Sequence, residues 1–269
     1  MMGEIIRLTG VTFAYPDEEQ QVFSDLNLML PPGITSVMGQ NGTGKSTLLL
    51  LASGRLFAQS GAVEILGMDS REMSSEEERN KYVSFIYQNM EFEADEPVEE
   101  LMGFIYQNGF HAEQSSTFVE ELIDVFELSV AKKTQMQNLS KGEIQRTILA
   151  FSLLYGSKII MMDEPIFALE DYQKKRAMEF FIDYARSNSV HLLYSIHELE
   201  ITEKYSDHVV LFTKDHSVKV GSTDDIITDD NIEAAYELPR TMLHQKEHLY
   251  RENLLRLSEI RPNMEIGEN

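Results

Sequence analysis

The stretch GITSVMGQNGTGKSTLLLLA, residues 33–52, decides the fold of this chain. Its apolar beginning, residues 33–39, predicts a short buried strand, and a helical pattern starts at Gly44 and runs through Leu51. Between them, the segment GQNGTGKST matches the pattern G-x-x-x-x-G-K-[ST]. Glycines in this pattern let backbone N–H groups close around phosphate oxygens, and a preceding strand and a following helix are the context that the motif requires. We therefore predict a nucleotide-phosphate site in an α/β fold.

The loop at residues 39–47 supplies most of the expected nucleotide contacts. Lys45 would reach the β- and γ-phosphates, and the hydroxyl of Ser46 would hold Mg²⁺. ATP and Mg²⁺ are accordingly the expected ligands. The loop residues that we expect to bind nucleotide are Gly39, Gln40, Asn41, Gly42, Thr43, Gly44, Lys45, Ser46 and Thr47.

A second segment, KIIMMDEP at residues 158–165, offers carboxylates for the same chemistry. Its four apolar residues, 159–162, predict a buried strand that delivers Asp163 at its carboxyl end, where ligands bind in open α/β sheets. A carboxylate there can hold Mg²⁺ directly or through water. Glu164 is expected to point the other way and to act on an attacking water. Paired acids also occur at solvated strand ends, and it is the loop at residues 39–47 that favours the catalytic interpretation.

Strand and helix patterns alternate along the rest of the chain, which favours a mostly parallel sheet with helices on both faces. An antiparallel β region is expected in the opening third. Strands are expected at residues 4–15, 22–30, 33–39, 61–67, 82–87, 158–163, 190–195, 208–212 and 217–220. Helices are expected at residues 44–51, 98–106, 118–126, 138–154, 171–186 and 199–205, with one further amphipathic helix at residues 247–260.

The same patterns predict three parts of the chain. Residues 1–88 and 156–221 would form the nucleotide-binding α/β core. A helical subdomain would be inserted at residues 89–155, where strand signals vanish, and residues 222–269 would form a helical C-terminal extension and tail. The sequence shows no internal repeat.

The amino-acid composition excludes several classes of function for this chain. The formal net charge of −22 argues against a nucleic-acid partner, because phosphate binding needs clustered Lys and Arg. The chain has no cysteine, which excludes disulfides, thiolate metal sites and cysteine nucleophiles. The first ten residues lack the basic and apolar parts of a signal peptide, and no apolar run approaches the roughly 20 residues of a membrane span. We therefore expect a cytoplasmic chain.

From about residue 5 to residue 221, the motifs and their order resemble the ATP-binding-cassette (ABC) ATPase family, whose core is a P-loop NTPase fold. Tyr15, in VTFAYP, is similar to the aromatic that stacks on adenine. Gln88, in FIYQN, looks like the Q-loop glutamine, and His197, in LLYSIHE, looks like the switch histidine that contacts the γ-phosphate. Taken singly, Tyr15 also fits an exposed strand position, and His197 also fits local contacts at a helix end. The resemblance implies catalytic roles for Glu164, His197 and Gln88, and metal ligation by Ser46, Gln88 and Asp163.

NLSKGEIQRTILAFSLL, residues 138–154, resembles the signature of that family, usually L-S-G-G-Q. Ser140 and Gly142 keep the two positions that the resemblance places on the γ-phosphate of a second, head-to-tail subunit, at a helix N-terminus that favours anions. Lys141 and Glu143 depart from the usual form. Ser140 and Glu143 also have capping-box spacing, so we expect them to satisfy the helix-end N–H groups when nucleotide is absent. A second cluster of departures, in DEPIFALE, consists of Ile166, Phe167 and Glu170.

One nucleotide-binding domain without a membrane span looks like the ATPase subunit of a transporter assembled from separate chains. The resemblance implies transmembrane permease subunits as partners, a homodimer or a heterodimer with a paralogous ATPase, and a place at the inner face of the membrane. The segment VGSTDDIITDDNIEAAYEL, residues 220–238, is similar to the end of siderophore, haem and cobalamin importer subunits. Exporter subunits and a soluble ABC ATPase of an assembly system, such as iron–sulfur cluster assembly, remain alternatives.

Overall fold

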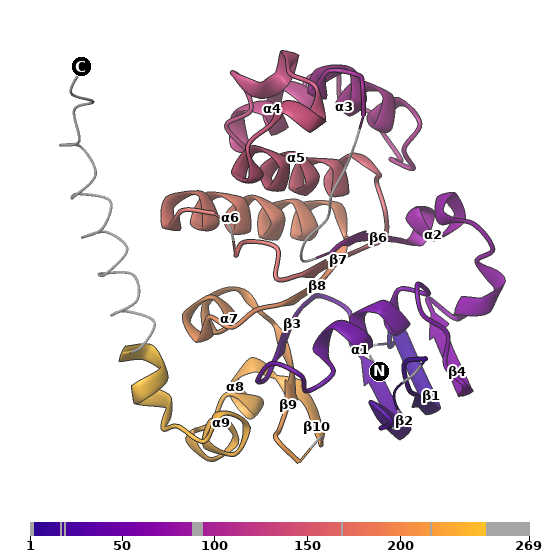
Figure 1. Cartoon of the computed structure of the whole chain (residues 1–269), viewed down its shortest axis with the longest axis vertical. Helices are drawn as coiled ribbons and strands as arrows, with labels where there is room; N and C mark the ends of the chain where they lie inside the picture. Colours follow the sequence, from indigo (N-terminus) through magenta and orange to yellow (C-terminus); the bar gives the residue numbers. More distant parts are fainter. Residues whose placement is uncertain are drawn as a thin grey trace, which may run out of the picture.

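A computed structural model of the chain describes residues 3–16, 18, 20–87, 94–167, 169–215 and 217–245. Within these residues the strands form two sheets (Figure 1). A four-stranded antiparallel sheet has the order β2-β1-β4-β5, with β1 (Ile6–Phe13), β2 (Phe23–Leu30), β4 (Ser60–Ile65) and β5 (Met68–Asp69). It confirms the expected N-terminal antiparallel region.

The second sheet has the order β10-β9-β3-β8-β7-β6. Only the pair formed by β9 and β10 is antiparallel, so the expectation of a mostly parallel sheet is confirmed. Its strands are β3 (Ile34–Met38), β6 (Val83–Ile86), β7 (Ile159–Asp163), β8 (His191–Ser195), β9 (His208–Phe212) and β10 (Val218–Ser222). The carboxyl ends of β3, β7 and β8 therefore lie at one edge of this sheet, and that edge receives the predicted loop and acids.

The helices are α1 (Lys45–Ala52), α2 (Glu76–Tyr82), α3 (Val98–Gln107), α4 (Phe118–Val125), α5 (Lys141–Leu154), α6 (Asp171–Asn188), α7 (Leu199–Tyr205), α8 (Thr223–Ile226) and α9 (Asp229–Tyr236), with short 3₁₀ turns at Ser70–Glu72, Ala131–Lys133 and Met136–Asn138. Helices α1 to α7 lie between strands in the chain, and α8 and α9 follow the last strand. The amphipathic helix predicted at residues 247–260 lies outside the described residues.

Strand β5 and helix α2 have no counterpart among the sequence-based expectations. Strand β5 is only two residues long, too short for an alternating pattern. Helix α2 buries none of its residues, so its sequence has no apolar stripe. Its first turn is capped by Ser75, whose hydroxyl accepts a hydrogen bond from Glu78 N–H, and acids fill that turn. Local capping stabilises the first turn of this helix, which has no buried face of its own.

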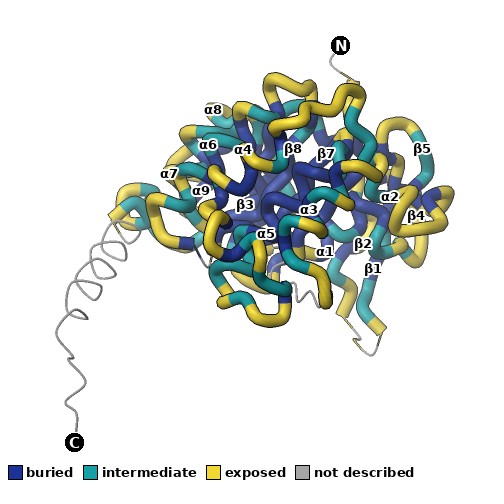
Figure 2. The backbone as a smooth tube through the Cα atoms, turned by 90° about the horizontal axis from the view of Figure 1, so that it is seen from above, coloured by how far each residue is buried: buried dark blue, intermediate teal, exposed yellow. Residues whose placement is uncertain are grey.

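The six-stranded sheet separates the core into two sides. Along β7, Ile159 and Met161 belong to the cluster that contains α1, whereas Ile160 and Met162 belong to the cluster that contains α3 to α6. This alternation follows from the two-residue period of a strand, and because both faces are covered, all five residues of β7 are buried. Figure 2 shows the buried backbone along β3, β7 and β8, with exposed residues around the periphery.

Helices α3, α4 and α5 share a single apolar cluster with α6 and with one face of the sheet. In Figure 1 these helices all lie on one side of β7 and β8, and α1 lies on the other side. The described part of the helical segment predicted at residues 89–155, which starts at residue 94, thus packs on the sheet through a common core. Its boundaries as a separate subdomain remain a prediction.

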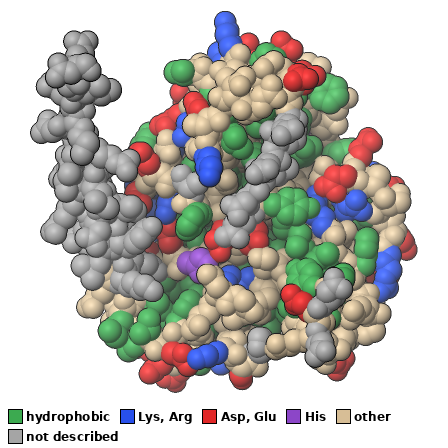
Figure 3. Space-filling model, viewed as in Figure 1, with side chains coloured by type: hydrophobic (Ala, Val, Ile, Leu, Met, Phe, Trp, Pro, Cys, Tyr) green, Lys and Arg blue, Asp and Glu red, His purple; other side chains and the backbone are tan. Residues whose placement is uncertain are grey.

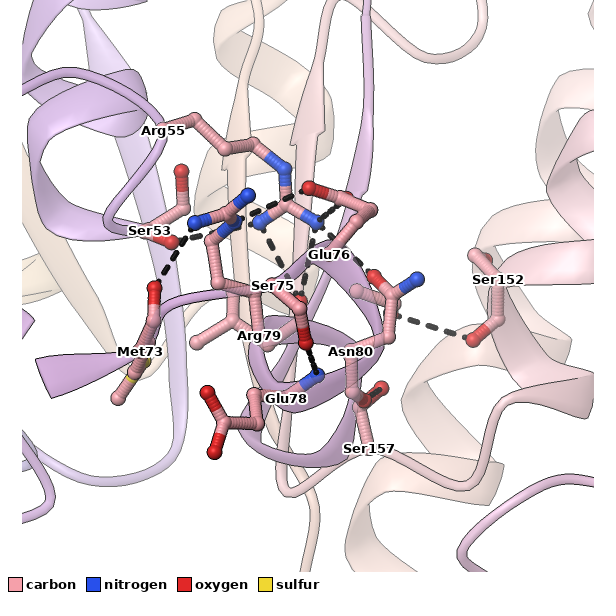
Figure 4. A network of polar contacts seen from close by, with 12 residues as sticks. Ser53, Arg55, Met73, Ser75, Glu76, Glu78, Arg79, Asn80, Ser152 and Ser157 are labelled. Carbon is pink, nitrogen blue, oxygen red and sulfur yellow. Dashed lines mark hydrogen bonds and ion pairs between the residues drawn. The ribbon is translucent and has the colours of Figure 1, made fainter.

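Arg55, three residues after α1, joins that helix to α2 and β6 (Figure 4). Its side chain is 5% exposed, and its guanidinium donates to the Glu76 carboxylate at 2.5 Å and to the Asn80 side chain at 2.9 Å. It also donates to the carbonyl oxygen of Val83, at 3.3 Å, and lies over the ring of Phe85, 5.3 Å from the centroid. These contacts fix the end of α1 against the strand that precedes the predicted Q-loop.

Arg55→Ala is expected to lower the free energy of unfolding by about 2–3 kcal/mol, below the usual loss on breaking a buried pair because Glu76 can be rehydrated. Urea denaturation with an unchanged m-value measures this loss. Arg71→Ala is the matched control, since Arg71 is 47% exposed and 3.9 Å from Asp69, and its loss should stay under about 1 kcal/mol. Equal losses in the two variants would refute the bracing role of Arg55.

Candidate nucleotide site

The predicted phosphate loop connects β3 to α1. Gly39 has a φ of +142°, and a Cβ there would lie 2.8 Å from the Cβ and from the carbonyl oxygen of Phe212, so only glycine fits. Gly44 occupies the N-cap of α1 with a φ of +104° and no side-chain cap. The first turn of α1 contains no acidic residue, so its N–H groups and the helix dipole favour an anion.

Lys45 is turned back into its own loop. Its ammonium donates hydrogen bonds to the carbonyl oxygens of Gly39 and Gln40, both at 2.9 Å. The residue is 5% exposed. Burial lowers the pKa of Lys45, and the carboxylates of Glu164 and Asp163 oppose that shift. A buried ammonium held by neutral carbonyl oxygens gains from an incoming phosphate, which offers charge-assisted hydrogen bonds.

The acids after β7 are held by the neighbouring strand β8. Ser195, at the end of β8, donates to Asp163 Oδ1 at 2.5 Å and accepts from the backbone N–H of Glu164 at 2.8 Å. Glu164 has a φ of +48°, the left-handed region that is uncommon for a residue with a side chain. The Ser195 hydroxyl therefore orients one carboxylate and fixes the backbone turn that carries the next.

His197 and Glu164 form a close pair. Nε2 of His197 lies 2.8 Å from Oε1 of Glu164, although the two residues are 33 positions apart in sequence. The Glu164 side chain is 14% exposed and the His197 side chain 38% exposed, so the pair faces solvent through the imidazole. The imidazole holds one oxygen of this carboxylate in place. The other carboxylate oxygen can then accept a proton from a water molecule. Figure 3 shows histidine, acidic and basic side chains side by side near the middle of one face.

The remaining loop residues differ in exposure. Asn41, Gly42 and Ser46 are exposed, whereas Thr43 and Thr47 are buried. Thr43 donates to the Gln40 carbonyl at 2.9 Å, which closes the loop on itself. The Tyr15 hydroxyl lies 3.0 Å from Thr47 Oγ1, and its ring packs edge-on against Phe13, so the predicted adenine platform stands beside α1.

The oxygen groups near the loop fit Mg²⁺. Ser46 offers an exposed hydroxyl and Asp163 a carboxylate, both hard oxygen ligands. Among the described residues, no group of three or more acidic or histidine side chains could hold a metal ion alone. Gln88, the other predicted ligand, lies outside the described residues.

The predicted capping box at the start of α5 is present. Ser140 N–H donates to the Glu143 carboxylate at 2.9 Å, and the Ser140 hydroxyl donates to the same oxygen at 2.6 Å. The Glu143 N–H donates in return to Ser140 Oγ at 3.4 Å. The hydrogen bond from the Ser140 side chain is the main cause that lowers the pKa of Glu143.

The structure does not bring Ser140 and Gly142 to the phosphate loop of the same chain. In Figure 1, α5 and α1 lie on opposite sides of β7 and β8, and Ser140 is exposed. The signature helix does reach the acidic loop, because Gln145 donates to the carbonyl oxygen of Pro165 at 2.7 Å.

Sequence reasoning missed three residues that shape this site: Ser195, Gln145 and Tyr236. Ser195 carried a weak signal, since it is a polar residue at the end of a buried strand. Gln145 carried no sequence signal beyond its place in a predicted helix. Tyr236 lies 197 residues from Gly39, whose N–H donates to the Tyr236 hydroxyl at 2.9 Å, and nothing in the local sequence marks that contact.

The sequence matches known proteins over most of its length. The family model described as ABC transporter matches residues 23–167, more than half of the chain. A petrobactin import ATP-binding protein of Bacillus anthracis is 25% identical over 227 residues, which cover 83% of this chain and 90% of that protein. A methionine import ATP-binding protein of Vibrio cholerae is 25% identical over 242 residues, which cover 88% of this chain and 70% of that protein.

Solved structures agree on the fold. The ATP-binding subunit of an ABC transporter superposes with a TM-score of 0.72 at 19% identity, covering 90% of this chain and 98% of the other. A dimeric ATP-binding cassette in a post-hydrolysis state, with ADP and Pi bound, superposes with a TM-score of 0.70 at 20% identity, covering 81% of this chain and 98% of the other. These likenesses establish the P-loop NTPase architecture of the two sheets and their helices.

Proposed function

The chain belongs to the ABC transporter family, as an ATP-binding ATPase subunit, and we propose that it powers import through transmembrane permease subunits by closing and opening a dimer on ATP. Both relatives described above are import proteins, which supports import over export. They also give no support to the alternative of a soluble assembly ATPase. In the part of the chain that the structure describes, no helix is long and apolar enough to span a bilayer.

The proposal rests on three loops that meet at one edge of the sheet, those that contain Lys45, Glu164 and His197. Lys45 holds the carbonyl oxygens of its own loop, and Glu164 is paired with His197 at 2.8 Å. On ATP binding, Lys45 would exchange those carbonyl oxygens for phosphate oxygens, which are stronger acceptors. Mg²⁺ bound at Ser46 and Asp163 would supply charge neutralisation at the phosphates. Glu164 would take the proton of the attacking water, and His197 would orient Glu164 and contact the γ-phosphate.

The capping box suggests how the second subunit enters. Ser140 and Gly142 would bind the γ-phosphate of the partner chain at the N-terminus of α5. In the structure the Ser140 hydroxyl donates to the Glu143 carboxylate. We take this capping box as the resting state of the phosphate-binding position on α5. An arriving phosphate would replace Glu143 as the acceptor. Lys141, exposed beside it, adds positive charge toward the same anion.

The three predicted parts of the chain fit this arrangement. We assign nucleotide binding to residues 1–88 and 156–221, and contact with the partner subunit and permease to the helical segment at residues 89–155. We assign residues 222–269 to the C-terminal extension. Through its permease partners, the subunit would sit at the cytoplasmic face of the membrane, with ATP rather than nucleic acid as its ligand.

Affinity purification from detergent-solubilised membranes of the host tests this function. We expect the tagged chain to carry a multi-span membrane protein with it, and the complex to release phosphate from ATP. The Lys45→Met chain, which should keep its fold and bind ATP much more weakly, is the control for the phosphate release. Recovery of soluble assembly proteins without any membrane protein would contradict the transport function.

A further inference from the structure

The start of the phosphate loop is held from outside by the C-terminal part of the chain. The N–H of Gly39 donates to the hydroxyl of Tyr236, the last residue of α9, at 2.9 Å. The carbonyl oxygen of Gly39 accepts from Lys45. Both peptide groups of this glycine are therefore fixed, one by the lysine that would bind phosphate and the other by a residue 197 positions away.

Helix α9 is anchored where this contact requires it. Ile232 and Ala235 are fully buried and share an apolar cluster with Met38, the residue directly before Gly39. The helix ends at Glu237, which has a φ of +58° and pairs with Lys214 at 2.8 Å. In Figure 1, α8 and α9 lie beside β9 and β10. The Tyr236 hydroxyl is thus presented by a packed helix rather than by a loose tail.

The same segment also contacts the helix behind His197. Arg240 donates from both Nε and an Nη to Oε1 of Glu203 on α7, at 3.0 and 2.6 Å. His244 lies 3.4 Å from the other oxygen of Glu203, and Asp229 lies 3.9 Å from Arg240. Helix α7 begins two residues after His197. Residues 229–245, which we call the C-terminal strap, therefore touch both the phosphate loop and the helix that follows His197.

We propose that Tyr236 is a positioning residue of the nucleotide loop, held in place by the C-terminal strap. Nucleotide binding draws Lys45 away from the Gly39 carbonyl. The hydrogen bond to the Tyr236 hydroxyl then keeps Gly39 in its position at the end of β3. The loop then remains shaped for phosphate instead of having to be reordered by it. This inference rests on the proposed nucleotide site and adds a residue outside its motifs.

Tyr236→Phe tests the role, because it removes the hydroxyl and keeps the ring. Loss of one hydrogen bond predicts a rise of about 3- to 10-fold in the Kd for MgADP. The KM for ATP should rise by about the same factor with kcat within about twofold, because the contact acts on binding. Titration with a fluorescent MgADP analogue and steady-state kinetics measure the two effects.

Tyr106→Phe is the matched control. Its hydroxyl likewise accepts from a backbone N–H, that of Ser115 at 2.6 Å, but in the α3 region. A purely structural role predicts a similar change in melting temperature for both variants and no change in nucleotide affinity. We expect only Tyr236→Phe to weaken MgADP binding. Wild-type affinity in that variant, or equal weakening in Tyr106→Phe, would overturn the proposal.

Arg240→Gln gives an independent reading if Tyr236→Phe does not fold. It leaves the hydroxyl in place and loosens the strap, so the Kd for MgADP should rise by about 2- to 5-fold, a smaller effect because the pair is partly exposed. An unchanged Kd would contradict the claim that the C-terminal strap holds Tyr236 in place. A wild-type chain that bound no MgADP would overturn the nucleotide site itself, and this inference with it.

Discussion

Glu164→Gln is expected to lower the rate of ATP hydrolysis by about 10²- to 10⁴-fold, the range for loss of a general base. The amide keeps the size of the side chain and can still approach His197, but it cannot accept a proton from water. The backbone turn should survive, since the Glu164 N–H to Ser195 contact does not involve the side chain. Phosphate release under saturating ATP measures the loss.

The same variant should retain ATP and therefore accumulate as a nucleotide-bound dimer, visible by size-exclusion chromatography with light scattering. Glu198→Gln is the matched control, because Glu198 neighbours His197 in sequence and pairs with Lys174 at 2.7 Å. Its hydrolysis rate should stay within about threefold of the wild type, since Glu198 takes no part in the proposed proton transfer. Hydrolysis by Glu164→Gln at the wild-type rate would remove Glu164 from the mechanism.

Lys45→Met is expected to weaken MgATP binding by about 100-fold, because two charge-assisted hydrogen bonds to phosphate, at roughly 1.5 kcal/mol each, are lost. Methionine matches the aliphatic stem of lysine, so the loop can keep its packing. Burial already lowers the pKa of Lys45, which means that the folded state disfavours the charged form. Removal of the ammonium relieves that cost but leaves the carbonyl oxygens of Gly39 and Gln40 without their donor, so the free energy of unfolding should change little.

This combination of lost binding and retained stability separates a ligand-binding role from a structural one. Lys158→Met is the matched control, since Lys158 is exposed at the opposite end of β7 from Asp163. Its MgATP affinity should equal that of the wild type. Undiminished MgATP binding by Lys45→Met, or a large loss of stability, would contradict the role assigned to the lysine.

Helix α2 shows why one element escaped prediction. Its apolar content is low and none of its residues is buried, so hydrophobic periodicity carries no signal there, and only the Ser75 cap and the acidic first turn favour it. Elements with a buried face behaved differently. Strand β7 and helix α5 lie close to their predicted bounds. Apolar residues in a buried strand or helix follow its two-residue or 3.6-residue period, so the sequence shows where the element lies.

The sequence by itself determined the glycine-rich loop between β3 and α1, the acids at the end of β7, the capping box on α5 and the α/β class, because each depends on residues close together in the chain. Only the tertiary structure decided that Glu164 meets His197, that Ser195 holds Asp163, and that Tyr236 holds Gly39. Those pairs are 32 to 197 residues apart. Their contacts arise from strand order and from the packing of α9 on the sheet, which no local pattern encodes.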